Sequence, residues 1–116
     1  MIFERRREKR KREVNRVSVE YLPEWPINGC KEINYGLTED ISLSGIKILT
    51  DSFFPIDRVM NISLSLGRNY NTIYMMGKVK WIRNLDDEVY EIGLEIVDTF
   101  KESIRILTGH LYGKAV

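Results

Sequence analysis

The amino-acid sequence predicts a mainly β protein with one helix near its C-terminal end. Apolar side chains recur at every second position through several short stretches, which is the period of a half-buried strand. Gly, Pro, Asn and Asp separate these stretches at intervals typical of an antiparallel barrel or sandwich. Near the C-terminus the apolar period becomes that of a helix. At 116 residues, the chain is long enough to form one domain with a core of its own.

The alternation predicts about six strands. In chain order, their alternating apolar residues are Val17, Val19 and Tyr21; Ile33, Tyr35 and Leu37; Ile46 and Ile48; Ile62, Leu64 and Leu66; Ile73, Met75, Val79 and Trp81, with Gly77 on the same face; and Tyr90, Ile92, Leu94 and Ile96. Because Trp81 shares a strand face with Met75 and Val79, we expect its ring in the core.

A helix follows the last strand. Phe100, Ile104, Leu107 and Leu111 form an apolar stripe at helical spacing. Thr99 and Glu102 match a capping box, with Asp98 as a competing N-cap. Gly109 and Gly113 limit the helix, and we expect it to fray after Thr108.

The N-terminal residues carry most of the positive charge. Residues 1–16, which we call the arm, hold eight Lys and Arg against three Glu, a charge of +5. The remaining residues, 17–116, sum to −4 and form the predicted folded domain. The arm lacks a core-forming apolar pattern after Phe3, so we expect it to be mobile. Its charge suggests an anionic partner, with nucleic acid, anionic lipid and a small phosphate ligand all open at this stage.

The sequence carries no recognisable catalytic or metal-binding pattern. The lone histidine, His110, has no evident partner, and the acidic run Asp86–Glu88 is typical of a solvated turn. Cys30 has no second cysteine, which fits a reducing cytoplasm, and Trp25 lies in a Pro-bounded loop. Phosphate-loop, dinucleotide and zinc spacings do not occur. The N-terminus lacks the apolar segment of a secretory signal, and no apolar run reaches membrane-spanning length. We therefore expect a cytoplasmic binding protein rather than an enzyme, with no metal, cofactor or membrane insertion.

Two short motifs suggest a ligand that contains guanine and phosphate. Arg12 and Arg16 precede the first strand, and the planar Arg side chain suits phosphate oxygens and the O6/N7 edge of guanine. In the segment DISLSG, Asp40 can accept the N–H donors of guanine and Ser42 can donate to a phosphate. Gly45 permits a close backbone approach or a positive φ.

These motifs, in this order, resemble the PilZ domain family of cyclic di-GMP receptors. Arg12–Arg16 matches its R-x-x-x-R motif and Asp40–Gly45 its D/N-x-S-x-x-G motif, while Gly77–Arg83 and Tyr90–Ile96 are similar to its later strands. The resemblance implies a six-stranded antiparallel barrel with a C-terminal helix. It also implies that Arg12, Arg16, Asp40, Ser42 and Gly45 bind cyclic di-GMP.

Three details of the resemblance leave alternatives. Arg6 and Arg10 have the same spacing as Arg12 and Arg16, although only the latter pair directly precedes the first strand. Lys11 is a further candidate, because a basic residue before the motif is associated in this family with two stacked ligands. Ser44 stands where the family often has Gly.

The resemblance implies a receptor whose arm, around residues 5–16, becomes ordered on the ligand and alters the binding of an effector protein in motility, exopolysaccharide or attachment control. A PilZ-like interaction module without ligand is the first alternative. A polyanion binder that uses the whole arm on nucleic acid or lipid is the second, and we do not expect nucleic acid to be the partner.

Overall fold

The computed structural model describes residues 8–22, 33–67 and 71–113. Trp25 and Cys30, the loop around Pro23–Gly29, and Arg6 lie outside these residues. The described elements, in chain order, are β1 (Lys11–Arg12), β2 (Arg16–Tyr21), β3 (Ile33–Ile41), β4 (Gly45–Thr50), β5 (Val59–Leu66), β6 (Asn71–Asp86), β7 (Val89–Thr99) and α2 (Lys101–Tyr112).

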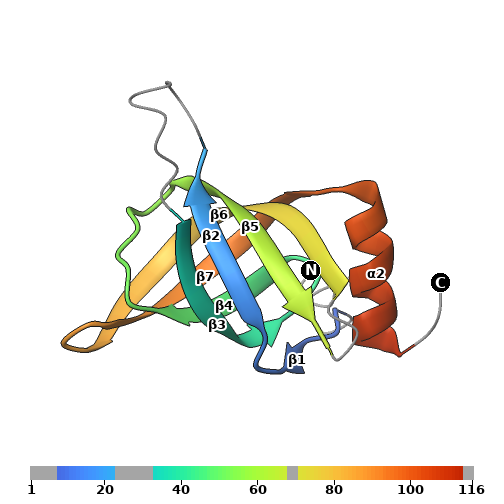
Figure 1. Ribbon diagram of the computed structural model, residues 1–116, viewed down its shortest axis with the longest axis horizontal. Coiled ribbons are helices and arrows are strands. Elements are labelled where there is room, and N and C mark those ends of the chain that lie inside the picture. Colours follow the sequence, from blue (N-terminus) through green and yellow to red (C-terminus); the bar gives the residue numbers. More distant parts are fainter. Residues whose placement is uncertain (1–7, 23–32, 68–70, 114–116) are drawn as a thin grey trace, which may run out of the picture.

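The six long strands close into an antiparallel barrel (Figure 1). The order β3-β2-β5-β6-β7-β4 is closed by pairing between β4 and β3, which distinguishes a barrel from a sandwich. The two-residue strand β1 adds to the end of β3, with Lys11 opposite Ile41 and Arg12 opposite Asp40. Closure leaves the long strands without an open edge, and the predicted barrel with a C-terminal helix is confirmed.

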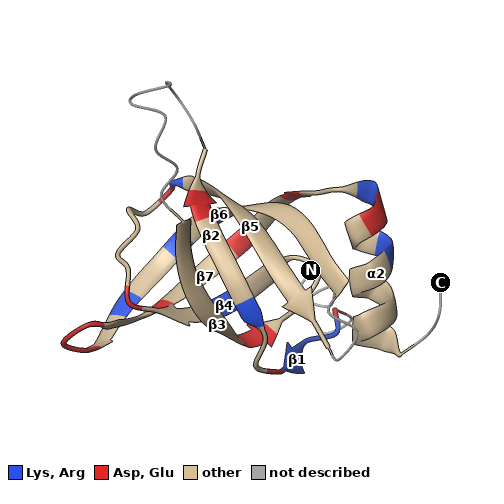
Figure 2. Ribbon diagram, in the orientation of Figure 1, with Lys and Arg blue, Asp and Glu red and all other residues tan. Residues whose placement is uncertain are grey.

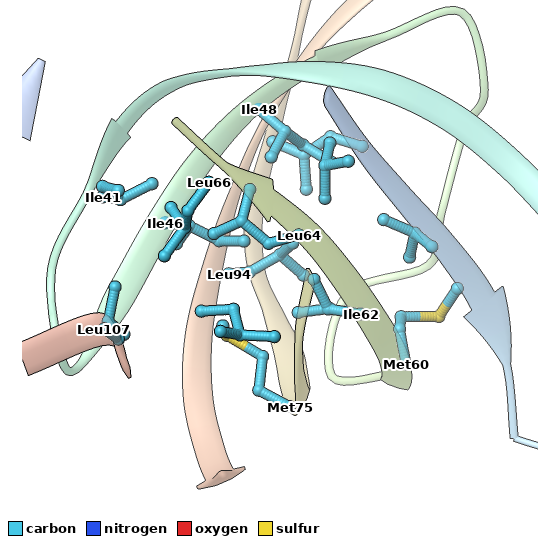
Figure 3. Packing of buried hydrophobic residues seen from close by; sticks show 14 of the residues in the cluster. Ile41, Ile46, Ile48, Met60, Ile62, Leu64, Leu66, Met75, Leu94 and Leu107 are labelled. Atoms are coloured by element: carbon cyan, nitrogen blue, oxygen red, sulfur yellow. The ribbon is translucent and has the colours of Figure 1, made fainter. Parts of the chain in front are cut away.

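The core lies inside the barrel and beneath α2 (Figure 3). It is formed by alternate residues of the strands together with the helix residues Leu107 and Leu111. On β5, for example, Met60, Ile62 and Leu64 are almost fully buried, while Asn61 and Ser63 between them are partly exposed. The alternation seen in the sequence therefore gives the inward face of this strand correctly.

The first half of β3 is reversed relative to this pattern. Ile33, Tyr35 and Leu37 are exposed on the outside of the barrel, and Thr38 points inward and is fully buried. Gly36, between them, lies so close to β4 that an added Cβ would stand 2.5 Å from the main-chain oxygen of Leu49. The alternating apolar side chains in the first half of β3 therefore lie on the surface of the barrel and not in the core.

The helix differs from expectation at both ends. Its N-cap is Phe100, which makes no side-chain capping hydrogen bond, so the predicted capping box of Thr99 and Glu102 does not form. Thr99 instead ends β7, opposite Met75 on β6, which places it in the sheet. At the other end α2 continues past Thr108 to Tyr112. It closes on Gly113, whose positive φ of 69° suits glycine and whose N–H donates to Gly109 O.

Two β-bulges change which side chains face outward. The pairing of β3 with β4 shifts between Thr38 and Asp40, and that of β6 with β7 shifts between Val79 and Trp81. Each extra residue reverses the alternation that follows it. As a result, Asp40 lies on the outer face with Lys47, while Ile41 enters the core. Trp81 also turns outward and is 42% exposed, so the predicted core position of Trp81 was wrong.

The arm is fixed to the barrel by Thr38. Its hydroxyl, on a fully buried residue, donates to Glu13 O (2.7 Å) and accepts from the N–H of Asn15 (2.8 Å). The N–H of Thr38 donates to Asn15 O (2.9 Å), and that of Glu13 to Glu39 O (3.1 Å). Residues 8–16 therefore lie against β3, although we had expected the whole arm to be mobile.

Replacing Thr38 by Val tests this anchor, because Val keeps the volume and removes the hydroxyl. The N–H of Asn15 and the carbonyl of Glu13 lose their buried partner, so we expect the free energy of unfolding to fall by about 1–3 kcal/mol. Trypsin should also cut the arm faster. Thr72→Val, at an exposed position on β6, is the matched control. Equal unfolding midpoints and cleavage rates for the two variants would contradict the anchor.

Candidate functional site

Four residues form one row across the outer face of the barrel. Asp40 on β3 lies opposite Lys47 on β4, Lys47 lies opposite Gly93 on β7, and Gly93 lies opposite Trp81 on β6. We call these residues the outer row. The two bulges put its two ends, Asp40 and Trp81, on the outside of the barrel. The row thus combines an anion, a cation and an aromatic ring on one surface.

Gly93 makes room for the ring of Trp81. A Cβ at Gly93 would stand 2.2 Å from Cε2 and Nε1 of Trp81, so the indole lies directly against the glycine. A hollow of about 360 Å³ lies over the row and also contacts Arg10, Ser44 and Glu95. An exposed ring on the floor of a charged hollow is suited to stacking a planar, polar ligand.

Asp40 is the electrostatic centre of the hollow. Arg10 of the arm donates from Nη1 to Asp40 Oδ1 at 2.8 Å, and Lys47 Nζ lies 3.7 Å from Oδ2. The Asp40 side chain is only 10% exposed, whereas that of Arg10 is 58% exposed. In Figure 2, the blue β1 lies below a red segment near the end of β3. The arm thus brings an exposed cation to a largely buried anion.

The turn from Ser42 to Gly45 is closed by its own hydrogen bonds. The hydroxyl of the fully buried Ser42 donates to Gly45 O (3.0 Å) and accepts from the N–H of Gly45 (3.1 Å). Ser42 therefore shapes the turn, whereas the sequence had suggested that it donates to a phosphate. Gly45 does not have a positive φ. It instead allows β4 to lie close to β7, since a Cβ at this position would stand 3.2 Å from Leu94 O.

Ser44, which the sequence singled out only as a departure from the family motif, is the exposed donor of this turn. Both its N–H (2.9 Å) and its hydroxyl (2.5 Å) donate to one carboxylate oxygen of Glu8. Burial acts to raise the pKa of Glu8, but the hydrogen bonds from the hydroxyl and the N–H of Ser44 and the charge of Arg10 together hold this pKa below its usual value. Glu8 is therefore ionised at neutral pH.

The arginines assigned from the sequence lie in other places. Arg12 is exposed on β1, opposite Asp40 in backbone register, but the ion pair with Asp40 is made by Arg10. Arg16 begins β2 opposite Leu37 and lines shallow hollows with Tyr35, away from the outer row. The structure therefore brings Arg10, and neither Arg12 nor Arg16, onto the carboxylate of Asp40. The sequence did contain this signal, as the second pair Arg6 and Arg10.

The other side of the arm contacts the end of α2. The N–H of Lys9 donates to the hydroxyl of Tyr112 (3.2 Å), and Lys11 Nζ donates to His110 O (3.4 Å). The carboxylate of Glu13 pairs with Nε2 of His110. Burial acts to raise the pKa of Glu13, but hydrogen bonds with Asn15 and His110 lower it below its usual value. Lys11 and His110 thus join the arm to the helix, and sequence reasoning missed this role of His110.

A second hollow, of about 240 Å³, lies near the start of α2. Tyr74, Met75 and Phe100 line its apolar part, and Glu20 and Asp98 are the charged residues in its lining. Because these charges are negative, this hollow is poorly suited to a phosphate ligand. The outer row remains the better candidate for the predicted chemistry.

Comparison with known proteins identifies the domain. A family model for the PilZ domain matches residues 4–113. The Bacillus subtilis inhibitor of motility (MotI/DgrA) has a similar structure, with a TM-score of 0.72 and 18% identity over 92% of this chain and 49% of that chain. The PilZ domain of YcgR from Escherichia coli, solved with c-di-GMP, has a TM-score of 0.67 and 14% identity over 94% of this chain and 90% of that chain.

Both solved structures are distant in sequence from this chain. The chain spans about half the length of the Bacillus protein, and at these identities the structural likeness concerns the fold. The comparison with curated protein sequences gave no match. Among the described residues, no helix has the length and apolarity needed to cross a membrane. The family match spans nearly all of the sequence, and we conclude that this chain belongs to the PilZ domain family.

Proposed function

We propose that this chain is a receptor that binds cyclic di-GMP between the arm and the outer row. The PilZ family is a family of cyclic di-GMP receptors, and the similar YcgR domain is described with that ligand. The observation that carries the proposal is the meeting of Arg10 with Asp40 on the same face as the exposed ring of Trp81. We propose no catalytic role, metal or cofactor.

Each group at the site has a matching part in the ligand. The carboxylate of Asp40 can accept the N1–H and N2–H₂ donors of a guanine, and Arg10 can donate to its O6 and N7. Trp81 offers a face on which a base can stack. Lys47 and the two donors of Ser44 suit phosphate oxygens. Ser42 and Gly45 act indirectly, by fixing the turn that presents Ser44.

The arginine pair that we favour is therefore Arg6 and Arg10. The ion pair of Arg10 with Asp40 supports this choice over Arg12 and Arg16, because it joins the arm to the D-x-S-x-x-G turn. Arg5 is then the basic residue before the pair, in place of Lys11. Since a basic residue there is associated in this family with two stacked ligands, we propose that two molecules of cyclic di-GMP bind.

The proposed output is a change in an effector protein's binding. Ligand contact with Arg10 moves the arm, and the contacts of Lys9, Lys11 and Glu13 pass that movement to the end of α2. Because cyclic di-GMP is an intracellular signal, such a receptor acts in the cytoplasm. The competing functions are a ligand-independent interaction module and a polyanion-binding arm, and the latter leaves the outer row without a role.

Calorimetric titration with cyclic di-GMP separates the two arginine pairs. We expect saturable binding by the natural protein and at least tenfold weaker binding by Arg10→Ala and Asp40→Ala, because each loses charge-assisted hydrogen bonds of about 1.5–3 kcal/mol. Arg12→Ala and Arg16→Ala should change the affinity less than about threefold. Arg105→Ala, on exposed α2, removes the same charge elsewhere.

Several outcomes would change this picture. Absence of heat at high micromolar protein would contradict the receptor function and favour the interaction module. Binding that falls steeply with salt and is insensitive to Asp40→Ala would favour the polyanion binder. A tenfold loss with Arg16→Ala and none with Arg10→Ala would restore the pair originally assigned from the sequence.

Gly93→Ala should displace the ring of Trp81, because the new Cβ has no room beside it. We expect a red-shifted Trp81 emission and roughly tenfold weaker binding of cyclic di-GMP, as one stacking contact of about 1–3 kcal/mol is lost. The measurement uses a Trp25→Phe background, since the chain has two tryptophans. Trp81→Phe, which keeps a ring, should bind more tightly than Trp81→Ala. Unchanged emission in Gly93→Ala would refute this placement of the ring.

A further inference from the structure

Glu8 occupies the exposed donors of the Ser42–Gly45 turn. One of its carboxylate oxygens accepts from both the N–H and the hydroxyl of Ser44. The hydroxyl of Ser42 is directed to Gly45 O within the turn, and that residue is fully buried. Ser44 therefore supplies the exposed side-chain donor of the turn, and Glu8 already uses it.

A carboxylate and a phosphate compete for such donors on equal chemical terms. Both present anionic oxygens that accept charge-assisted hydrogen bonds from N–H and O–H groups. The contacts of Glu8 with Ser44 have lengths typical of such bonds. A phosphate oxygen that accepts from the same N–H and hydroxyl needs the position of the Glu8 oxygen, so the two anions exclude each other.

Glu8 and Arg10 are close neighbours in the arm and contact adjacent parts of the candidate site. Glu8 lies two residues before Arg10, whose guanidinium pairs with Asp40. The arm thus brings an anion to the donors of the turn and a cation to the acceptor of the outer row. With both contacts formed, the arm satisfies the groups that a nucleotide with guanine and phosphate would use.

We propose that Glu8 is a built-in competitor, whose carboxylate holds the anion position at Ser44 and must leave before a ligand phosphate binds there. This inference rests on the proposed binding of cyclic di-GMP. It adds that the ligand must displace Glu8 from the same site, which lowers the affinity. Ser44 is the counterpart of the competitor, since a Gly at this position would lack the hydroxyl. The contact is therefore a feature of this chain's own pair of residues.

The competition operates at neutral pH without proton uptake. The pKa of Glu8 is lowered, so the contact is fully formed above the ordinary carboxyl pKa and is lost only as the pH falls through the lowered value. Ligand displacement, rather than protonation, is thus what opens the site under neutral conditions.

The test is a double-mutant cycle of Glu8→Ala and Ser44→Gly, titrated with cyclic di-GMP. Removing Glu8 should tighten binding by about three- to tenfold, the effect of one or two net hydrogen bonds that no longer need breaking. In the Ser44→Gly background the gain should be clearly smaller, because the hydroxyl contact is already absent and only the N–H of residue 44 still donates to Glu8. The cycle separates this contact from the general effect of one less negative charge, which is the same in both backgrounds.

Amide hydrogen exchange of Ser44 provides a readout that needs no ligand. The Ser44 N–H should be protected in the natural protein and exchange faster in Glu8→Ala, whereas Glu102→Gln, a charge change on exposed α2, should leave it unchanged.

The outcomes separate the two proposals. Equal or weaker binding by Glu8→Ala, or an equal gain in both backgrounds, overturns the competition while cyclic di-GMP binding stands. Equal Ser44 exchange with and without Glu8 overturns the contact itself. Binding by neither the natural protein nor Glu8→Ala overturns the proposed function, and the competition falls with it.

Discussion

The buried hydroxyl of Thr38 is the interaction on which the candidate site depends. It holds the main chain at Glu13 and Asn15 and so fixes where the arm leaves the first long strand. From that point the arm runs beside the end of β3, which places Arg10 at Asp40, two residues beyond Thr38. A buried hydroxyl in an apolar barrel needs partners, because leaving it unpaired costs about 1–3 kcal/mol. The hydrogen bonds that satisfy the hydroxyl of Thr38 therefore also position the arm.

The barrel, the core face of most strands and the helix follow from periodicity in the sequence, but the site does not. Two single-residue bulges reverse the alternation after Thr38 and after Val79, so Asp40 and Trp81 face outward. A bulge arises from pairing with another strand, and a single-strand pattern carries no signal of it. The arm posed a different problem, because Arg6–Arg10 and Arg12–Arg16 have the same spacing. The contact of Thr38 with Glu13 and Asn15 places Arg10, rather than Arg12 or Arg16, at Asp40, and that contact joins residues more than twenty positions apart.

The described part of the arm has two sides with different partners. Glu8 and Arg10 contact the Ser42–Gly45 turn and Asp40, whereas Lys9, Lys11 and Glu13 contact the last turns of α2. Alternation of even and odd positions is what an extended chain gives. If Glu8 and Arg10 are displaced, the neighbouring residues Lys9 and Lys11 must move with them, because they belong to the same extended chain. The main chain of the arm thus couples the outer row to α2. In Figure 1, β1 lies at the lower edge of the barrel, near the C-terminal end of α2.

The polar groups of the candidate site already have partners within the protein, and this affects how much each can contribute to the free energy of ligand binding. A ligand that takes over Asp40 and Ser44 must first break the contacts of Arg10 and Glu8, so the new charge-assisted hydrogen bonds are partly offset by those that are lost. Groups that are not already engaged contribute to the binding free energy without this offset. The ring of Trp81 is 42% exposed, and base stacking is worth about 1–3 kcal/mol. The polar groups of the outer row therefore determine which ligand fits and supply part of the affinity, while Trp81, held outward by a bulge and by Gly93, adds a stacking contact without this offset.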